Sequence, residues 1–207
     1  VISTGVHNTL IGGLAGDALT DADDNVALGV NALSSDTKGN KSTAIGRTAL
    51  QAQNFTTATD TFNVAVGFSA GVAVTTGVQN TLIGALAGDA LTTSNNNVAL
   101  GYNALSTDTL GSHSVAVGPY ALQTQNFTTA TDSFNTGVGY NAGGAVTTGI
   151  NNTLIGGQAG DALTTGGNNV AVGLAALGSD DLGSQSVAIG VSALAAQNSE
   201  TAVITYN

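Results

Sequence analysis

The sequence predicts an all-β chain folded as a parallel β-solenoid, or β-roll, and three observations carry this prediction. The thirteen-residue stretch NTLIGGLAGDALT begins at Asn8 and returns with few changes at Asn80 and Asn152, so the chain has a 72-residue super-repeat. Each super-repeat divides into four shorter units, and each unit closes a short β-branched run with a glycine. No stretch keeps the 3.6-residue period of a helix over three turns, so strands are favoured throughout.

Three positions are constant in kind in all eleven shorter units. The unit opens on Asn or Ser, its fifth residue is always Gly, and the residue three after this Gly is always Ala. Successive closing glycines are 17 or 21 residues apart. We take the following as representative structural positions: Asn8, Gly12, Ala15, Asn25, Gly29, Ala32, Asn80, Gly84, Ala87, Asn152, Gly156 and Ala159.

Each five-residue motif is expected to contain one strand of four or five residues, because a β-branched run bounded by Asn or Ser and by Gly is typical of a strand. The expected strands lie within 8–12, 25–29, 42–46, 63–67, 80–84, 97–101, 114–118, 135–139, 152–156, 169–173 and 186–190. Hairpin signals between them are absent, so the strands should stack in parallel, one rung of 17 or 21 residues for each unit. Eleven rungs at about 4.8 Å give a rod section of roughly 50 Å.

Side-chain direction along the strands predicts an oligomer. Val26 and Leu28 should point to one face and Ala27 to the other, so both faces of the strand are apolar. One coil has only one interior, and we expect sister chains to cover the second face in an intertwined homotrimer. The small Ala and Gly residues after each strand are then expected at a crowded axis between chains. Residues 1–207 are interpreted as one repetitive β-solenoid shaft segment. This segment is expected to be a fragment of a longer chain, cut at Asn207, where another unit would open.

Composition excludes several classes of function. The chain has 29 Gly, one Pro, no Cys and a net charge of −10, with only three basic residues. Three cations cannot neutralise the several phosphates that nucleic-acid binding requires, nor bind an anionic membrane surface. Without Cys there is no disulfide framework and no thiolate metal site, which fits an extracellular chain. No apolar run has the ~20 residues of a membrane span, and no cofactor is expected.

We expect no catalytic residue and no metal ligand. His7 and His113 occupy positions that hold other residue types in equivalent units, and no hydrolase, zinc-protease or phosphate-loop motif occurs. Asp17, Asp89 and Asp161 recur in the GDALT turn. Their expected role is to cap that turn by accepting backbone N–H bonds. Calcium binding is the alternative, although the crowded carboxylates near Asp21 are lost in the later copies.

Two further features concern the ends of the strands. The Asn or Ser before each strand should stack as a polar ladder from rung to rung, and Asn there can also accept a positive φ. The four-residue insertion occurs twice and brings two Phe residues each time, Phe55 with Phe62 and Phe127 with Phe134. These aromatics are expected either to clamp neighbouring loops or to form a lateral contact ridge.

The pattern of Asn or Ser, Val or Thr, Ala, an aliphatic residue and Gly, followed by Ala three residues later, resembles the head repeats of trimeric autotransporter adhesins. It is also similar to repeats in bacteriophage tail fibres, whose longer units are closer to the period found here. The resemblance spans essentially the whole chain from Asn8 to Ala193. It implies a structural, non-enzymatic shaft of a trimeric virion or extracellular fibre that presents a receptor-binding tip. The alternative is the head or stalk of a bacterial surface adhesin. Host or cell-surface receptors would then bind through parts outside this segment.

Overall fold

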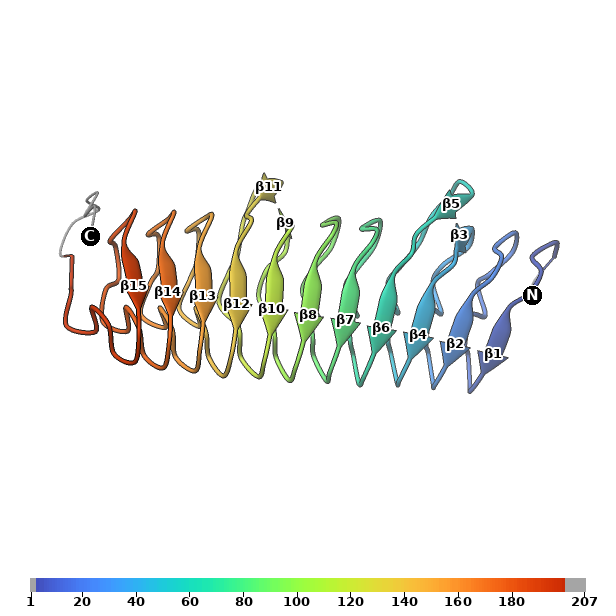
Figure 1. Ribbon diagram of the computed structural model, residues 1–207. Helices are drawn as coiled ribbons and strands as arrows, with labels where there is room; N and C mark the ends of the chain where they lie inside the picture. The colour runs from blue at the N-terminus through green and yellow to red at the C-terminus, as the bar shows by residue number, and fades with distance from the viewer. Residues whose placement is uncertain (1–2, 200–207) are drawn as a thin grey trace.

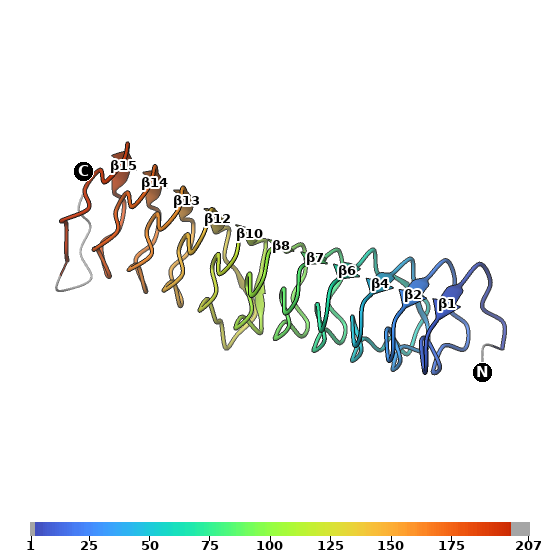
Figure 2. The same cartoon turned by 90° about the horizontal axis from the view of Figure 1, so that it is seen from below.

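The computed structural model describes residues 3–199, which form an elongated rod of stacked turns (Figure 1). These residues contain no helix, and eleven short strands join edge to edge in one sheet in which every pairing is parallel. The predicted all-β parallel solenoid of about eleven turns is confirmed. The first strand and the last lie at opposite ends of the rod (Figures 1 and 2). The expected unit boundary at Asn207 lies outside the described residues.

The strands of the large sheet occupy the middle three residues of each predicted motif. They are β1 (Thr9–Ile11), β2 (Val26–Leu28), β4 (Thr43–Ile45), β6 (Val64–Val66), β7 (Thr81–Ile83), β8 (Val98–Leu100), β10 (Val115–Val117), β12 (Thr136–Val138), β13 (Thr153–Ile155), β14 (Val170–Val172) and β15 (Val187–Ile189). The predicted length of four or five residues for each strand was therefore too long. The closing glycine leaves the extended conformation, as Gly101 does with a φ of 139°, and so ends the strand.

Registers are the same along the whole rod. The central residue of each strand pairs with the central residue of the next, as Leu10 does with Ala27 and Ala27 with Ala44. The two insertions emerge from the rod as arms, each with a two-residue parallel pair (Figure 1). In the first arm β3 (Gly39–Asn40) pairs with β5 (Thr59–Asp60), and in the second β9 (Gly111–Ser112) pairs with β11 (Thr131–Asp132).

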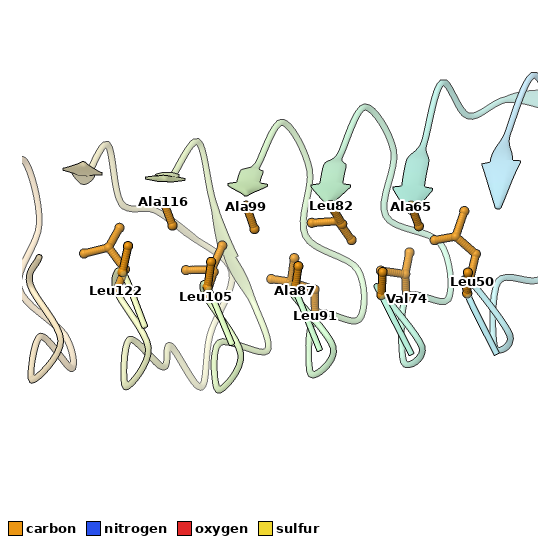
Figure 3. Close-up of a cluster of buried hydrophobic side chains, with 14 of the residues drawn as sticks. Leu50, Ala65, Val74, Leu82, Ala87, Leu91, Ala99, Leu105, Ala116 and Leu122 are labelled. Carbon is orange, nitrogen blue, oxygen red and sulfur yellow. The ribbon is translucent and has the colours of Figure 1, made fainter. Parts of the chain in front are cut away.

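The core is a thin column of Ala and Leu inside the coil (Figure 3). Small and large residues complement each other across it. Where the strand centre is Leu82, the residue after the constant Ala is Gly88, and a Cβ there would stand 2.7 Å from a Leu82 methyl. Where the strand centre is Ala99, the corresponding residue is Leu105, which is fully buried. The alternation of Gly and Leu after the constant Ala is therefore a volume match inside a close-packed core, made within a rung or with the next one. Gly71 shares its rung with the small Ala65, and a Cβ at Gly71 would stand 2.6 Å from a methyl of Leu82 in the next rung.

The constant alanines do not require an axis between chains. Ala32, Ala87 and Ala159 are fully buried by their own chain, and Ala15 is nearly so. The expectation that they lie at a crowded interchain axis was wrong, because the coil is so thin that the corner opposite each strand reaches the centre of the same chain. Crowding at the closing glycines is likewise within the chain, since each one from Gly12 to Gly173 lies against the glycine of the next rung.

Candidate functional site

The outer face of the large sheet is uncharged, largely apolar and at least partly exposed at every outward-facing position of the described rod. Side chains alternate as predicted, so Ala27 is buried whereas Leu28 is 41% exposed and Ile11 is 58% exposed. Every outward-facing strand position holds Thr, Val, Ile or Leu, and none of them carries a charge. This face is therefore an uncharged, largely hydrophobic strip that the chain's own fold leaves in contact with solvent.

A row of aromatic side chains borders this strip at the turn that follows the closing glycines. We call it the aromatic corner; it consists of Phe68, Tyr102, Tyr120 and Tyr140. The ring of Tyr120 lies edge-to-face with both neighbouring tyrosines, at centroid distances of 5.5 Å to Tyr102 and 5.9 Å to Tyr140. The guanidinium of Arg47 stands 5.8 Å from the centroid of Phe68. Sequence reasoning missed this row, although each member is the first or second residue after a constant glycine.

Large exposed hydrophobic residues gather on this one side of the described rod. All sixteen lie between the second residue before a ladder Asn or Ser and the second residue after a closing glycine. The long return segment of each turn contributes none. The sixteen are Val6, Ile11, Leu14, Leu28, Val30, Phe62, Phe68, Ile83, Tyr102, Phe134, Tyr140, Ile155, Leu174, Val187, Ile189 and Val191.

The polar ladder runs along the inside of the rod at the start of each strand. The Oδ1 atom of Asn80 accepts the backbone N–H of Asn97 at 3.0 Å, and its Nδ2 donates to the carbonyl of Ser94 at 2.8 Å. The same pair of bonds recurs at Asn25 and Asn152, and both residues are fully buried. The ladder Asn itself does not have a positive φ, contrary to expectation. The left-handed residue is the one before it, such as Gln79 with a φ of 60°.

Where a longer turn interrupts the ladder, a second buried network bridges it. Gln125 donates from Nε2 to Ser114 Oγ at 2.7 Å and to Asp108 Oδ2 at 2.6 Å, and its Oε1 accepts from Asn135 Nδ2 at 2.9 Å. The Asp108 carboxylate also accepts the backbone N–H groups of Gly111 at 3.0 Å and of Phe127 at 3.2 Å. All of these donors are buried, so this carboxylate organises the base of the second arm.

The same carboxylate constellation occurs three times at equivalent positions. Asp36 accepts from Gly39, Gln53 and Phe55, and Asp180 accepts from Gly183, Gln197 and Ser199. Asp36, Asp108 and Asp180 are fully buried. Sequence reasoning did not identify these residues. The available signal was their recurrence at 72-residue intervals, each one three residues before a glycine.

The four phenylalanines of the insertions do not form one ridge. Phe55 and Phe127 are 7% and 5% exposed and anchor the arms to the rod, whereas Phe62 and Phe134 are exposed. The predicted lateral ridge is therefore wrong for Phe55 and Phe127. The backbone N–H of Phe55 donates to the buried Asp36 carboxylate, and that of Phe127 donates to Asp108. These bonds hold each phenylalanine at the base of its arm, with the ring turned inward. Each insertion therefore has one buried phenylalanine, which packs against the rod, and one exposed phenylalanine.

A hydrogen-bonded polar pair lies beside each of the outer aromatics, Phe62 and Phe134. Lys41 Nζ lies 2.5 Å from Asp60 Oδ2 and 5.3 Å from the centroid of the Phe62 ring. The hydrogen bond between Lys41 and Asp60 raises the pKa of the lysine and lowers the pKa of the aspartate. In the second arm His113 takes the place of Lys41, with Nδ1 3.0 Å from Asp132 Oδ1 and its ring stacked on Phe134.

Of the recurrent turn aspartates, Asp89 and Asp161 are partly buried, whereas Asp17 is exposed. Asp89 Oδ1 is shielded from solvent and has no hydrogen-bond partner, although the side chain accepts a bond from its own backbone N–H. Asp161 accepts a bond from its own backbone N–H and a long one of 3.5 Å from Gln158 Nε2. Burial raises the pKa of Asp89 and of Asp161 above the ordinary value of 3.8. These carboxylates therefore lie in positions that disfavour their charged form.

Substitution of Asp89 by Asn should stabilise the chain at neutral pH. A raised pKa in the folded state means that the folded chain binds this proton more tightly than the unfolded chain does. Stability is therefore lost as the pH rises from the ordinary value of 3.8 through the raised pKa, and Asp89→Asn removes that loss. We expect a higher melting temperature than wild type at pH 7 and convergence of the two below pH ~4. The exposed Asp21→Asn variant controls for the removal of one negative charge, and an equal stabilisation there would contradict the role of burial.

Within residues 3–199 no pocket opens in the surface, and no three His, Asp or Glu side chains lie together as a metal site would need. No helix among these residues is long and apolar enough to span a membrane. Comparisons with protein-family models, with curated proteins and with solved structures give no match to this chain. The candidate functional surface is therefore defined by its own geometry: the apolar strip, the aromatic corner and the two arms.

Proposed function

We propose that this chain is a shaft segment of a trimeric virion or extracellular fibre, of the phage tail-fibre type, that presents a receptor-binding tip. The observation that carries the proposal is the unbroken stack of eleven parallel strands with one register and a buried Asn ladder. Ladder bonds join successive rungs, and the buried glutamine network joins the rungs on either side of each longer turn. In such an array each repeat contacts only its neighbours, so added repeats lengthen the rod and would hold the tip of a fibre away from its base.

In this proposal each unit is one rung of 17 or 21 residues, and the 72-residue super-repeat places one arm in every four rungs. Stacked rungs about 4.8 Å apart give the described segment a length of roughly 50 Å. A longer array would extend the rod without changing its cross-section. Nearly identical stretches then recur because each rung packs against its two neighbours in the same way.

The proposed partners are two further copies of the same chain. A strip of uncharged Thr, Val, Ile and Leu along the full sheet needs cover, since monomeric proteins rarely expose apolar patches above a few hundred Å². Three parallel copies around a common axis would bury this strip while all rods point the same way. Receptors would bind through other parts of the fibre, and the segment would act outside the cell without catalysis or cofactor.

A second candidate is the head or stalk of a trimeric bacterial surface adhesin. The observation in its favour is that the three constant positions each perform a separate structural task here. Asn80 forms the ladder, Gly84 permits rung-to-rung backbone contact, and Ala87 fills the core. A repeat selected for these tasks suits an adhesin head as well as a fibre shaft.

Labelling of the native particle tests the proposed function and separates the two candidates. Antibodies raised against residues 3–199 would be applied to isolated virions and to intact bacterial cells and viewed by electron microscopy. The proposal expects label along a fibre between its base and its distal tip. Label on bacterial cell surfaces alone would favour the adhesin. Label confined to a capsid interior or the cytoplasm would contradict both.

A further inference from the structure

Two apolar strips meet along one edge of the rod. The first is the outward face of the large sheet, and the second is the turn after the closing glycines, which includes the aromatic corner. The tyrosine rings already lie edge-to-face along three successive rungs, so their positions are fixed within the chain. Exposed rings held in this way present contact area without a large further loss of side-chain entropy on binding.

The composition of the two strips matches that of the buried centre of a protein interface. Such centres are enriched in Tyr, Phe and Arg and poor in Lys, Asp and Glu. The aromatic corner supplies three Tyr and one Phe beside Arg47, and the sheet face carries no charge. A strip of roughly 50 Å by about 10 Å, widened by the corner, approaches the ~800 Å² that each partner buries in a standard stable interface.

We propose that the aromatic corner of one copy packs against the outer sheet face of the next copy, at the same height along the rod. This inference rests on the proposed function, and it specifies which surfaces of the copies meet. The two strips differ from each other and lie on adjacent sides, so corner-to-face packing is a heterologous contact. A heterologous contact repeated by rotation about one axis closes a ring. A closed ring also requires that no copy is shifted along the rod axis relative to the next. Corresponding rungs of all copies therefore lie at the same height.

Substitution of the corner tyrosines tests this inference directly. Tyr102→Ser with Tyr140→Ser removes two rings that are 46% and 57% exposed, so the fold of each chain should be retained. We expect at least a tenfold rise in the protein concentration at which half of the chains are trimeric, measured by sedimentation equilibrium. A charged substitution on the sheet face, Val117→Lys, should weaken the trimer in the same direction.

The arms provide a matched control. Phe62→Ser with Phe134→Ser also removes two exposed aromatics, 50% and 55% exposed, but from positions before the strands. This variant should leave the trimer intact. The inference is overturned if the arm variant weakens the trimer as much as the corner variant, or if the corner variant has no effect on a trimeric wild type. A wild type that stays monomeric at every concentration would instead overturn the trimer of the proposed function, and the inference with it.

Discussion

Gly101→Ala is expected to destabilise the rod by about 4 kcal/mol or more, a loss at the upper end for single substitutions. A Cβ at this position would stand 2.6 Å from both the carbonyl carbon and the oxygen of Gly118. The φ of 139° is in addition a conformation that residues with a side chain rarely adopt. Neither strain can relax locally, because the opposing atoms are backbone atoms of the next rung. Urea unfolding at a fixed protein concentration measures the loss.

Two other glycines separate the sources of this effect. Gly190 has a comparable φ of 124°, but a Cβ there would meet only Ala193, at 4.0 Å, so Gly190→Ala isolates the backbone strain. Gly13 has no atom within 4 Å of its added Cβ and no positive φ, so Gly13→Ala should be nearly neutral. Equal losses at Gly101 and Gly190 would refute a contribution from the close approach of successive rungs.

Asp108→Ala is expected to cost about 3–5 kcal/mol. The substitution removes the acceptor of three buried donors, the backbone N–H groups of Gly111 and Phe127 and the Nε2 of Gln125. Donors left without a partner lose their bonds and remain shielded from water. Because Gln125 also joins Ser114 to Asn135, the ladder should weaken on both sides of the insertion. Relative to wild type, the variant should show faster backbone hydrogen exchange at β9 and β11, and an unchanged exchange rate at the distant β1.

The matched control is Asp132→Ala in the same arm. Its carboxylate is 61% exposed and pairs with His113, so its removal should cost less than about 1 kcal/mol. Asp108→Asn keeps the shape but replaces one acceptor oxygen with a donor that faces Gln125, and its cost should fall between the two. A loss at Asp132 as large as that at Asp108 would show that the buried network does not organise the arm.

The solenoid was predictable from sequence because its determinants are local and repeated. The position of Gly12, Gly29 and their copies set the number of strands, and the alternation of Val26, Ala27 and Leu28 set their inner and outer faces. The ladder was predictable for the same reason. A period that repeats eleven times leaves few ways to place a polar residue at each strand start.

The arms and the buried carboxylates were not predictable in this way. Asp36 and Phe55 are nineteen residues apart, and their contact depends on how the longer turn folds back onto the rung before it. Identical Phe residues within one insertion separate into buried Phe55 and exposed Phe62, which composition cannot distinguish. The constant Ala was misplaced because the sequence gives no measure of the coil's thickness.

The measurement that tests the central claim most directly is the solution mass of residues 1–207, determined by light scattering and sedimentation over a range of concentrations. A shaft whose apolar sheet face is covered by sister copies predicts three times the chain mass of 20.1 kDa, with the frictional ratio of an elongated particle. A monodisperse particle of 20.1 kDa at high concentration would contradict this account, because the uncharged strip would then be stable in water without any partner.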